Sequence, residues 1–157
     1  MPHPSILRVE SALAEAGSTA QVRELPESTH TALEAAAALG VGVGQIAKSV
    51  VLLAGGTPVM VVASGAHRVD TGKLSAHLGG ATITKADAET VRAATGYSIG
   101  GVSPAGLGGS PAVLVDRALA AFDVVWAAAG TPRAVFPTTF DELLRITGGE
   151  PADVAEQ

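Results

Sequence analysis

The sequence contains no cysteine, and this absence excludes several kinds of chemistry. A chain without thiols has no disulfide, no thiolate metal site and no cysteine nucleophile. Aromatic residues are also scarce, at 3% of the chain, so the core must consist mainly of Val, Leu, Ile and Ala. Hydrophobic residues nevertheless make up 47% of the 157 residues, and this length and composition predict a single well-packed domain.

Long apolar runs and an excess of positive charge are missing as well. No run approaches the roughly 18 apolar residues that cross a bilayer, and the first residues lack the basic and apolar regions of a signal peptide. We therefore expect a soluble, cytoplasmic protein without membrane contact. The formal net charge is −5, whereas proteins that grip a long duplex are usually basic. DNA binding is not expected, and any contact with nucleic acid should be local, at a patch or a strand end.

The spacing of apolar, capping and turn residues predicts helices and strands without a regular βαβ alternation. Helices are predicted at 5–16, 32–40, 70–78, 87–95 and 140–147. Strands are predicted at 19–25, 45–54, 57–64, 81–84, 111–116, 123–129 and 133–137. The second and third strands should form a hairpin, and the last should lie at a sheet edge. We expect one α+β domain with a mixed sheet over residues 1–147, followed by a frayed polar tail at 148–157.

A single charged residue, Lys48, stands in the otherwise apolar strand "IAKSVVLL". By the two-residue period of a strand, Lys48 shares one face with Ile46 and Val50, and the other face is mostly apolar too. Lysine is rarely fully buried without an anion, because removing its charge from water costs several kcal/mol. Two interpretations remain open. The side chain reaches a sheet edge or pairs with a structural carboxylate, or it serves ligand binding or catalysis.

The connection at 95–107, "TGYSIGGVSPAGL", is long and rich in glycine. Loops of about a dozen residues are uncommon unless they bind something or are disordered, and this one is too apolar for a solvated linker. Gly100 and Gly101 permit backbone conformations that aim N–H groups at an oxygen, and Pro104 stiffens the segment. Tyr97 is expected to be exposed. The alternative is a tight connection without a binding role.

Two further glycine patterns point to weaker hypotheses. "GVSPA" approaches the G-x-S-x-G nucleophile elbow with Ser103 as the nucleophile, but Ala105 replaces the last glycine and Pro104 stands where a helix should begin. "GVGVG" at 40–44 lacks a preceding strand and the full dinucleotide-binding spacing. A helix stop followed by a turn is the expected structure there.

The four histidines are His3, His30, His67 and His77. No two of them lie four residues apart on one predicted helix, so we expect no metal site and no cofactor. His67 precedes the helix predicted at 70–78. It belongs either to the capping turn of that helix or to the rim of a pocket.

Taken together, these segments resemble the YbaK/prolyl-tRNA synthetase-associated editing-domain family. The order is "STHTALEAAAALGV", "GQIAKSVVLL", "SGAHRVDTGKLSAHLG", "ATGYSIGGVSPAG" and "FPTTFDELLRIT". The resemblance covers roughly residues 5–147. Its most specific parts are Lys48 within its apolar strand and the G-x-x-x-P loop at 100–104.

The resemblance implies an α+β fold with a mixed, partly barrel-like sheet flanked by helices. It also implies hydrolysis of the ester between a wrong amino acid and its tRNA. Lys48 would position the aminoacyl end, and the backbone of Gly100 and Gly101 would hold the aminoacyl group, with N–H groups that stabilise a developing oxyanion. Water or a ribose hydroxyl would attack, without a metal. The candidate substrate-binding residues are Ile46, His67, Ile99, Val102, Ser103 and Pro104.

The expected function is that of a free-standing deacylase that acts in trans on tRNA carrying a small amino acid, Ala, Ser, Thr or Cys. Short or branched side chains should frame its pocket: Ile46, Val50, Val61, Ile99 and Val102. One alternative is a non-catalytic relative that binds tRNA ends or an aminoacyl-tRNA synthetase. Another is a serine hydrolase of small esters, which requires an exposed Ser103.

The expected partner is the 3′ end of an aminoacyl-tRNA, with a synthetase as a further option. Because the chain is acidic overall, binding should be weak and should depend on a basic patch around the pocket. The candidates for this patch are Arg68, Lys73, Arg92 and Arg133.

Overall fold

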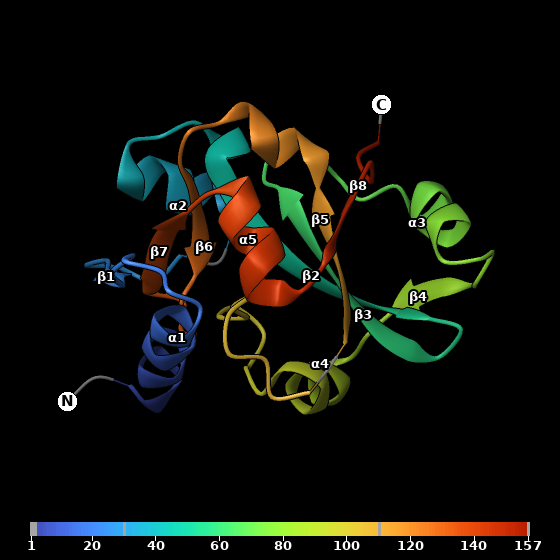
Figure 1. The fold of residues 1–157 in the computed structure, drawn as a ribbon, viewed down its shortest axis with the longest axis horizontal. Coiled ribbons are helices and arrows are strands. Elements are labelled where there is room, and N and C mark those ends of the chain that lie inside the picture. Colours follow the sequence, from blue (N-terminus) through green and yellow to red (C-terminus); the bar gives the residue numbers. More distant parts are fainter. Residues whose placement is uncertain (1–2, 30, 110, 157) are drawn as a thin grey trace.

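The computed structural model describes residues 3–29, 31–109 and 111–156. Within these ranges the chain forms one mixed eight-stranded sheet with five α-helices and two short 3-10 helices around it, which confirms the α+β class (Figure 1). The strands are β1 (Arg23–Glu24), β2 (Ile46–Ala54), β3 (Thr57–Ser64), β4 (Ile83–Lys85), β5 (Ala112–Asp116), β6 (Val125–Ala128), β7 (Ala134–Thr138) and β8 (Glu150–Ala152). The helices are α1 (Pro4–Glu15), α2 (Ala32–Leu39), α3 (Thr71–His77), α4 (Ala88–Thr95) and α5 (Phe140–Thr147), with 3-10 turns η1 (Val43–Gln45) and η2 (Arg117–Ala121).

The starts of α2 and α5 follow from their capping residues. The spacing of Thr31 and Glu34 predicts a capping box, and both of its hydrogen bonds are present, each at 3.1 Å. At α5 the Thr139 hydroxyl accepts from the Glu142 N–H at 3.0 Å, but the Glu142 carboxylate accepts from the Thr138 hydroxyl instead of closing the box. The second box is therefore only half formed.

The sheet has the order β1-β7-β6-β2-β3-β5-β8, with β4 beside β2. The predicted hairpin of β2 and β3 is confirmed, with Lys48 opposite Ala63 and Val50 opposite Val61. Parallel pairs join β2 to β6, β3 to β5, and β5 to β8, while the other pairs are antiparallel. Because the order ends at β1 and β8, the described strands form an open mixed sheet and not a closed barrel.

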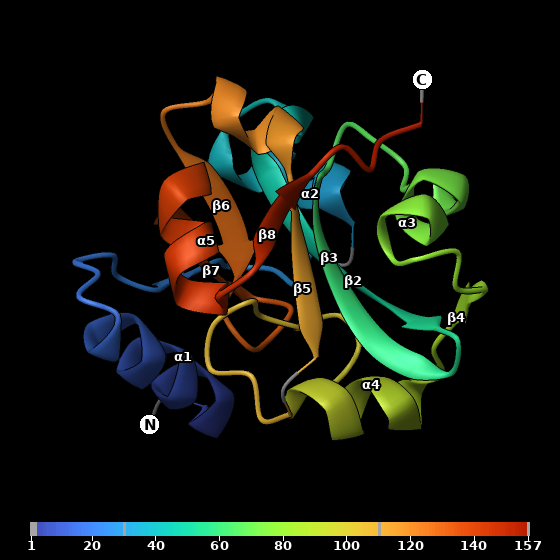
Figure 2. The ribbon, with the colours of Figure 1, turned by 45° about the vertical axis from the view of Figure 1, so that its right-hand side comes forward.

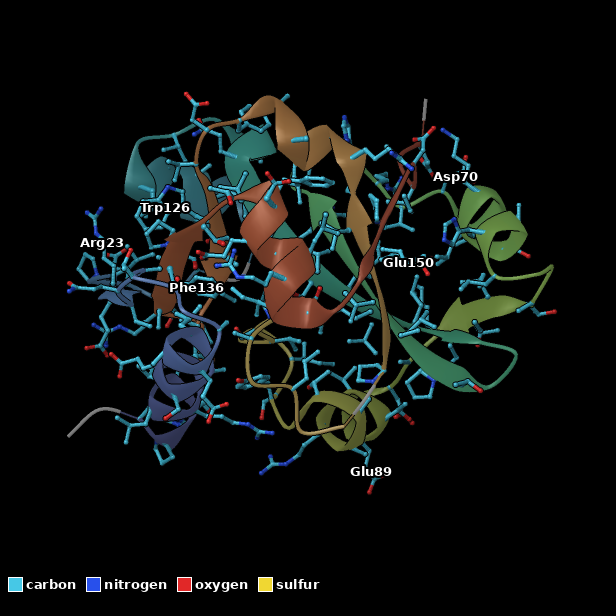
Figure 3. All side chains as sticks on the ribbon, in the orientation of Figure 1. Arg23, Asp70, Glu89, Trp126, Phe136 and Glu150 are labelled. Atoms are coloured by element: carbon cyan, nitrogen blue, oxygen red, sulfur yellow. The ribbon has the colours of Figure 1, made fainter. Side chains whose placement is uncertain are left out.

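The main core lies between one face of the sheet and the helices α1, α4 and α5, whereas α3 packs on the opposite face (Figure 2). Phe136 on β7 is fully buried in the main core, near α1 and α5. A third, smaller cluster joins α2 to Ile46, and Trp126 lies beside α2 in this cluster (Figure 3). The buried aliphatic side chains thus form three packed clusters.

The expectation of a frayed tail at 148–157 is wrong for its described part. β8 pairs in parallel with β5, Val154 is buried, and the Lys73 ammonium donates to the Ala155 carbonyl oxygen at 2.9 Å. The tail is polar on average, but Ala152 and Val154 stand two residues apart and pack in the same core cluster. This alternation is a strand signal that average polarity hides.

The expected positions of two other strands also need correction. The strand predicted at 19–25 is reduced to Arg23 and Glu24. β7 is not an edge strand, because it pairs with β6 on one side and with β1 on the other. The short β1 covers an edge that would otherwise be open.

Candidate functional site

β2 changes partners along one of its edges. Ile46 and Ala47 pair with β6, and residues 52–54 pair with β4. In the described part of the chain no strand pairs with residues 48–51 on this edge, although the whole of 47–54 pairs with β3 on the other. The sheet therefore has an opening beside Lys48.

A cavity of about 360 Å³ occupies this opening, a size within the range of small-molecule sites. Its walls come from β2, from the start of α2, from β6 and the following turn into β7, and from the glycine-rich loop. The lining residues are Thr29, Thr31, Ala32, Ala35, Ile46, Ala47, Lys48, Ser49, Val50, Val51, Ala86, Val91, Ile99, Gly100, Val102, Trp126, Ala127, Ala128, Thr131, Pro132, Ala134 and Val135. Both faces of β2 contribute, because six consecutive residues of the strand are among them.

Two walls of the cavity are held together by hydrogen bonds. Both the N–H and the hydroxyl of Thr29 donate to the Pro132 carbonyl oxygen, at 2.7 and 3.0 Å. Thr31, which also lines the cavity, is fixed by its capping box at the start of α2. The segment before α2 and the turn before β7 thus form a braced rim.

Lys48 is the one charged residue among the described residues that line the cavity. Its side chain is half-buried, and this burial is the main cause that lowers the pKa of Lys48 below its usual value. The nearby Arg68 lowers the pKa further, while Asp116 raises it. Within the described residues Lys48 has no hydrogen bond or ion pair. The geometry thus favours a cation available to a ligand over a structural salt bridge.

The glycine-rich loop lines the same cavity as Lys48 through Ile99, Gly100 and Val102. Gly100 has a φ of 98°, which side chains rarely adopt. Gly101 serves a different need. A Cβ atom at this position would lie 2.7 Å from Cα of Thr131, so the loop can approach the turn before β7 only with glycine there.

The rest of the loop is packed, which corrects the expected exposure of Tyr97. That side chain is 1% exposed, and its hydroxyl donates to the Ala105 carbonyl oxygen. Burial raises the pKa of Tyr97 to about 12. Ser103 and Pro104 are buried as well and do not line the cavity. The loop is therefore a folded support for Gly100 rather than a solvated linker.

The buried Ser103 contradicts the serine-hydrolase alternative. Its hydroxyl is inaccessible to water and accepts a hydrogen bond from the Ala105 N–H at 3.1 Å. We expect Ser103→Ala to lower the free energy of unfolding by about 1 kcal/mol, the usual value of one hydrogen bond. Deacylation per folded molecule should be unchanged in a single-turnover assay. A stable Ser103→Ala protein without turnover would restore Ser103 as a nucleophile.

His67 lies outside the cavity lining. Its Nδ1 is 3.6 Å from a carboxylate oxygen of the buried Asp116 but has no hydrogen-bond partner among the described residues. The Asp116 carboxylate accepts instead from the N–H groups of Ser64 and Ala118. The capping role belongs to Asp70, whose side chain accepts from two N–H groups of α3. His67 thus lies beside the Asp116 carboxylate, which raises the pKa of Lys48. It neither caps the helix nor lines the cavity.

The other expected site residues are placed as follows. Val61 is buried away from the cavity, in the cluster under α3. Lys73 and Arg133 are engaged by carbonyl oxygens of the C-terminal segment and of residues 25–26, and Arg92 donates to the Ser98 hydroxyl at 3.5 Å. In the described residues no group of three or more His, Asp or Glu side chains could hold a metal ion, and His30 lies outside those residues.

Sequence reasoning missed two parts of the site. The walls from α2 and from residues 126–135 could not be assigned, because nothing local indicates that they meet β2. Ser49 carried a usable signal, since it is a polar residue next to Lys48 in an apolar strand.

No helix among the described residues is long and apolar enough to span a membrane.

Comparison with known proteins identifies the family to which the chain belongs. A family model described as an aminoacyl-tRNA editing domain matches residues 26–146. A solved structure of a protein proposed to be a trans-editing enzyme for prolyl-tRNA synthetase has a TM-score of 0.92 and 43% identity, and the match covers 100% of both chains.

Curated relatives agree with the family match. The uncharacterised protein YwhH of Bacillus subtilis is 34% identical over 123 residues, which cover 78% of each chain. The proline–tRNA ligase of Bacillus licheniformis is 32% identical over 154 residues, which cover 88% of this chain but only 27% of the ligase. The chain belongs to the aminoacyl-tRNA editing domain family, whose activity is that of an aminoacyl-tRNA deacylase.

Proposed function

We propose that the chain acts in trans, as a free-standing deacylase that removes a small amino acid from a mischarged tRNA. The observation that carries this proposal is that the half-buried Lys48, the one cation among the described lining residues, shares a largely apolar cavity of about 360 Å³ with the glycine-rich loop. The relation to prolyl-tRNA synthetases makes a tRNA that this synthetase charges the first substrate to try.

In the proposed mechanism, Lys48 binds the phosphate or ribose oxygens at the 3′ end of the tRNA. The main-chain N–H of Gly100, which lines the cavity, stabilises the negative charge that develops on the ester carbonyl oxygen. The N–H of Gly101 does not take part, because it donates to the Ser98 carbonyl oxygen at 3.1 Å. Water, or the neighbouring ribose hydroxyl followed by water, attacks the carbonyl carbon. The ester C–O bond breaks, the amino acid leaves as its carboxylate, the ribose oxygen takes up one proton of the attacking water, and the other proton is released to solvent.

The size of the lining side chains suggests how substrates are selected. Ala, Val and Ile dominate the cavity, and Trp126 is its one described aromatic residue. A hydrophobic pocket discriminates one methylene by only about 1–3 kcal/mol, so activity should extend over several small amino acids and exclude large ones.

A deacylation screen tests this proposal, with purified tRNAs that carry Ala, Ser, Thr, Cys, Pro or Phe. We expect turnover of one or more of the small esters and none of the Phe ester. Equal hydrolysis of Ala-tRNA and Phe-tRNA would contradict a pocket that filters by size. Binding of charged tRNA without hydrolysis of any ester would instead support the non-catalytic alternative.

The lowered pKa of Lys48 predicts how the rate depends on pH. A lysine binds an anion only while protonated, so the rate should fall at alkaline pH, with an apparent pKa below the usual value of 10.5. The measurement is a single-turnover profile from about pH 6 to 10, with spontaneous ester hydrolysis subtracted. Lys48→Arg keeps its charge over this range and should lose the alkaline limb. If Lys48→Arg showed the same fall in rate at alkaline pH, that fall would be caused by the titration of another group.

A further inference from the structure

Ser49 combines two features that the proposed mechanism does not use. Its hydroxyl oxygen is buried and has no hydrogen-bond partner in the described residues, although Ser49 lines the cavity. Buried polar groups normally have partners, and an unmade hydrogen bond in the interior is costly. The hydroxyl can turn among its staggered rotamers toward a bound group without breaking an existing hydrogen bond.

The main chain of Ser49 also faces the cavity. The Gly65 N–H donates to the Ile46 carbonyl oxygen at 2.7 Å, so the polar groups of Ile46 point toward β3. Main-chain groups alternate between the two edges of a strand that pairs antiparallel. The N–H and carbonyl of Ser49, three residues later, therefore point to the opposite edge, where residues 48–51 have no strand partner among the described residues.

The charges in the cavity limit what this edge can bind. Lys48 and Ser49 are consecutive, so their side chains lie on opposite faces of β2. Ser49 shares its face with Ala47 and Val51 of the main core. No Asp or Glu is among the described lining residues. A cationic ligand group would thus avoid Lys48 and would need neutral oxygen acceptors, which Ser49 offers in its carbonyl and hydroxyl groups.

We propose that Ser49 binds the α-amino group of the aminoacyl ester through its carbonyl oxygen and its hydroxyl oxygen. This proposal rests on the proposed function, because it assumes that the ester enters the cavity. With Lys48 on the tRNA side and Gly100 at the ester carbonyl, Ser49 supplies the third point of attachment. Three points fix the orientation of an L-amino acid.

The test compares two ligands that cannot be hydrolysed and differ only in the amino group. They are 3′-alanylamino-3′-deoxyadenosine and 3′-propionylamino-3′-deoxyadenosine. Binding is measured by calorimetry at about pH 6, where an α-amino group with a pKa of roughly 8 is protonated. The wild-type protein should bind the alanyl ligand at least about 10-fold more tightly, which is typical of hydrogen bonds to a charged group.

Two variants of nearly equal shape isolate the hydroxyl. Ser49→Thr retains it, and Ser49→Val replaces it with a methyl group, both with β-branched side chains that suit a strand. Ser49→Thr should keep the preference for the alanyl ligand, and Ser49→Val should reduce it about 5- to 10-fold without a lower melting temperature. The matched control is Ser75→Ala, since the Ser75 hydroxyl donates to the Ala81 carbonyl oxygen outside the cavity. This control should leave both affinities unchanged.

The outcomes separate this proposal from the proposed function. The role of Ser49 would be overturned if Ser49→Thr and Ser49→Val preferred the alanyl over the propionyl ligand equally. It would also be overturned if the wild-type protein did not bind the alanyl ligand. If the wild-type protein hydrolyses Ala-tRNA under these outcomes, the proposed function still stands. If it hydrolyses no charged tRNA but shows the expected ligand preferences, the proposed function fails and the assignment of Ser49 stands.

Discussion

Replacing Lys48 with methionine is expected to lower the single-turnover rate of deacylation by roughly 10- to 150-fold. This range corresponds to the loss of one charge-assisted contact, about 1.5–3 kcal/mol. The melting temperature at neutral pH should stay the same or rise. Burial lowers the pKa of Lys48, so at neutral pH the folded state holds a charge that it disfavours, and methionine removes this cost.

Lys73→Met is the matched control for this prediction. The Lys73 ammonium donates to the Ala155 carbonyl oxygen and lies 3.5 Å from Asp153, outside the cavity. Its replacement should lower the melting temperature and leave the rate per folded molecule unchanged. The reverse pattern, a destabilised but fully active Lys48→Met, would make Lys48 a structural residue and remove it from the site.

Gly101→Ala is expected to produce the second large effect. The added Cβ would lie 2.7 Å from Cα and 2.8 Å from N of Thr131, and backbone atoms cannot move aside as flexible side chains do. The loop should therefore shift away from the turn before β7, at a cost of about 1–3 kcal/mol in stability. Because Gly100 moves with it, we expect a loss of deacylation of up to about 100-fold, which misplacement by 1 Å can cause.

Gly42→Ala is a suitable control for the substitution itself. Like Gly101, Gly42 does not require a positive φ, and a Cβ there meets only a Gln45 side-chain oxygen at 3.8 Å. Melting temperature and single-turnover rate should both stay near the wild-type values. If Gly101→Ala retained the wild-type rate, deacylation would not depend on the exact position of the loop at 100–104.

The features that sequence reasoning predicted correctly depend on neighbouring residues. The β2–β3 hairpin follows from two apolar runs around Gly55 and Gly56, both of which have positive φ. Helix α2 follows from its cap at Thr31 and its stop at Gly40. Lys48 could be singled out because its neighbours in the strand are apolar residues that are usually buried, whereas a lysine is rarely buried without a partner.

The features that were missed depend on contacts between distant parts of the chain. β8 pairs with β5 across more than thirty residues of sequence, and no local pattern indicates which distant strands will pair. The opening beside residues 48–51 exists only because β6 and β4 pair with different parts of β2. Lys48 and the glycine-rich loop were predictable as separate features, whereas the cavity that they share with α2 was not.

The most direct test of the account is a crystal structure of the protein with bound 3′-alanylamino-3′-deoxyadenosine. We expect the alanyl group in the cavity between residues 48–51 and Gly100, with its carbonyl oxygen toward the loop and the adenosine toward Lys48. A ligand bound elsewhere on the molecule, with the cavity beside Lys48 left empty, would contradict the assignment of this cavity as the deacylation site.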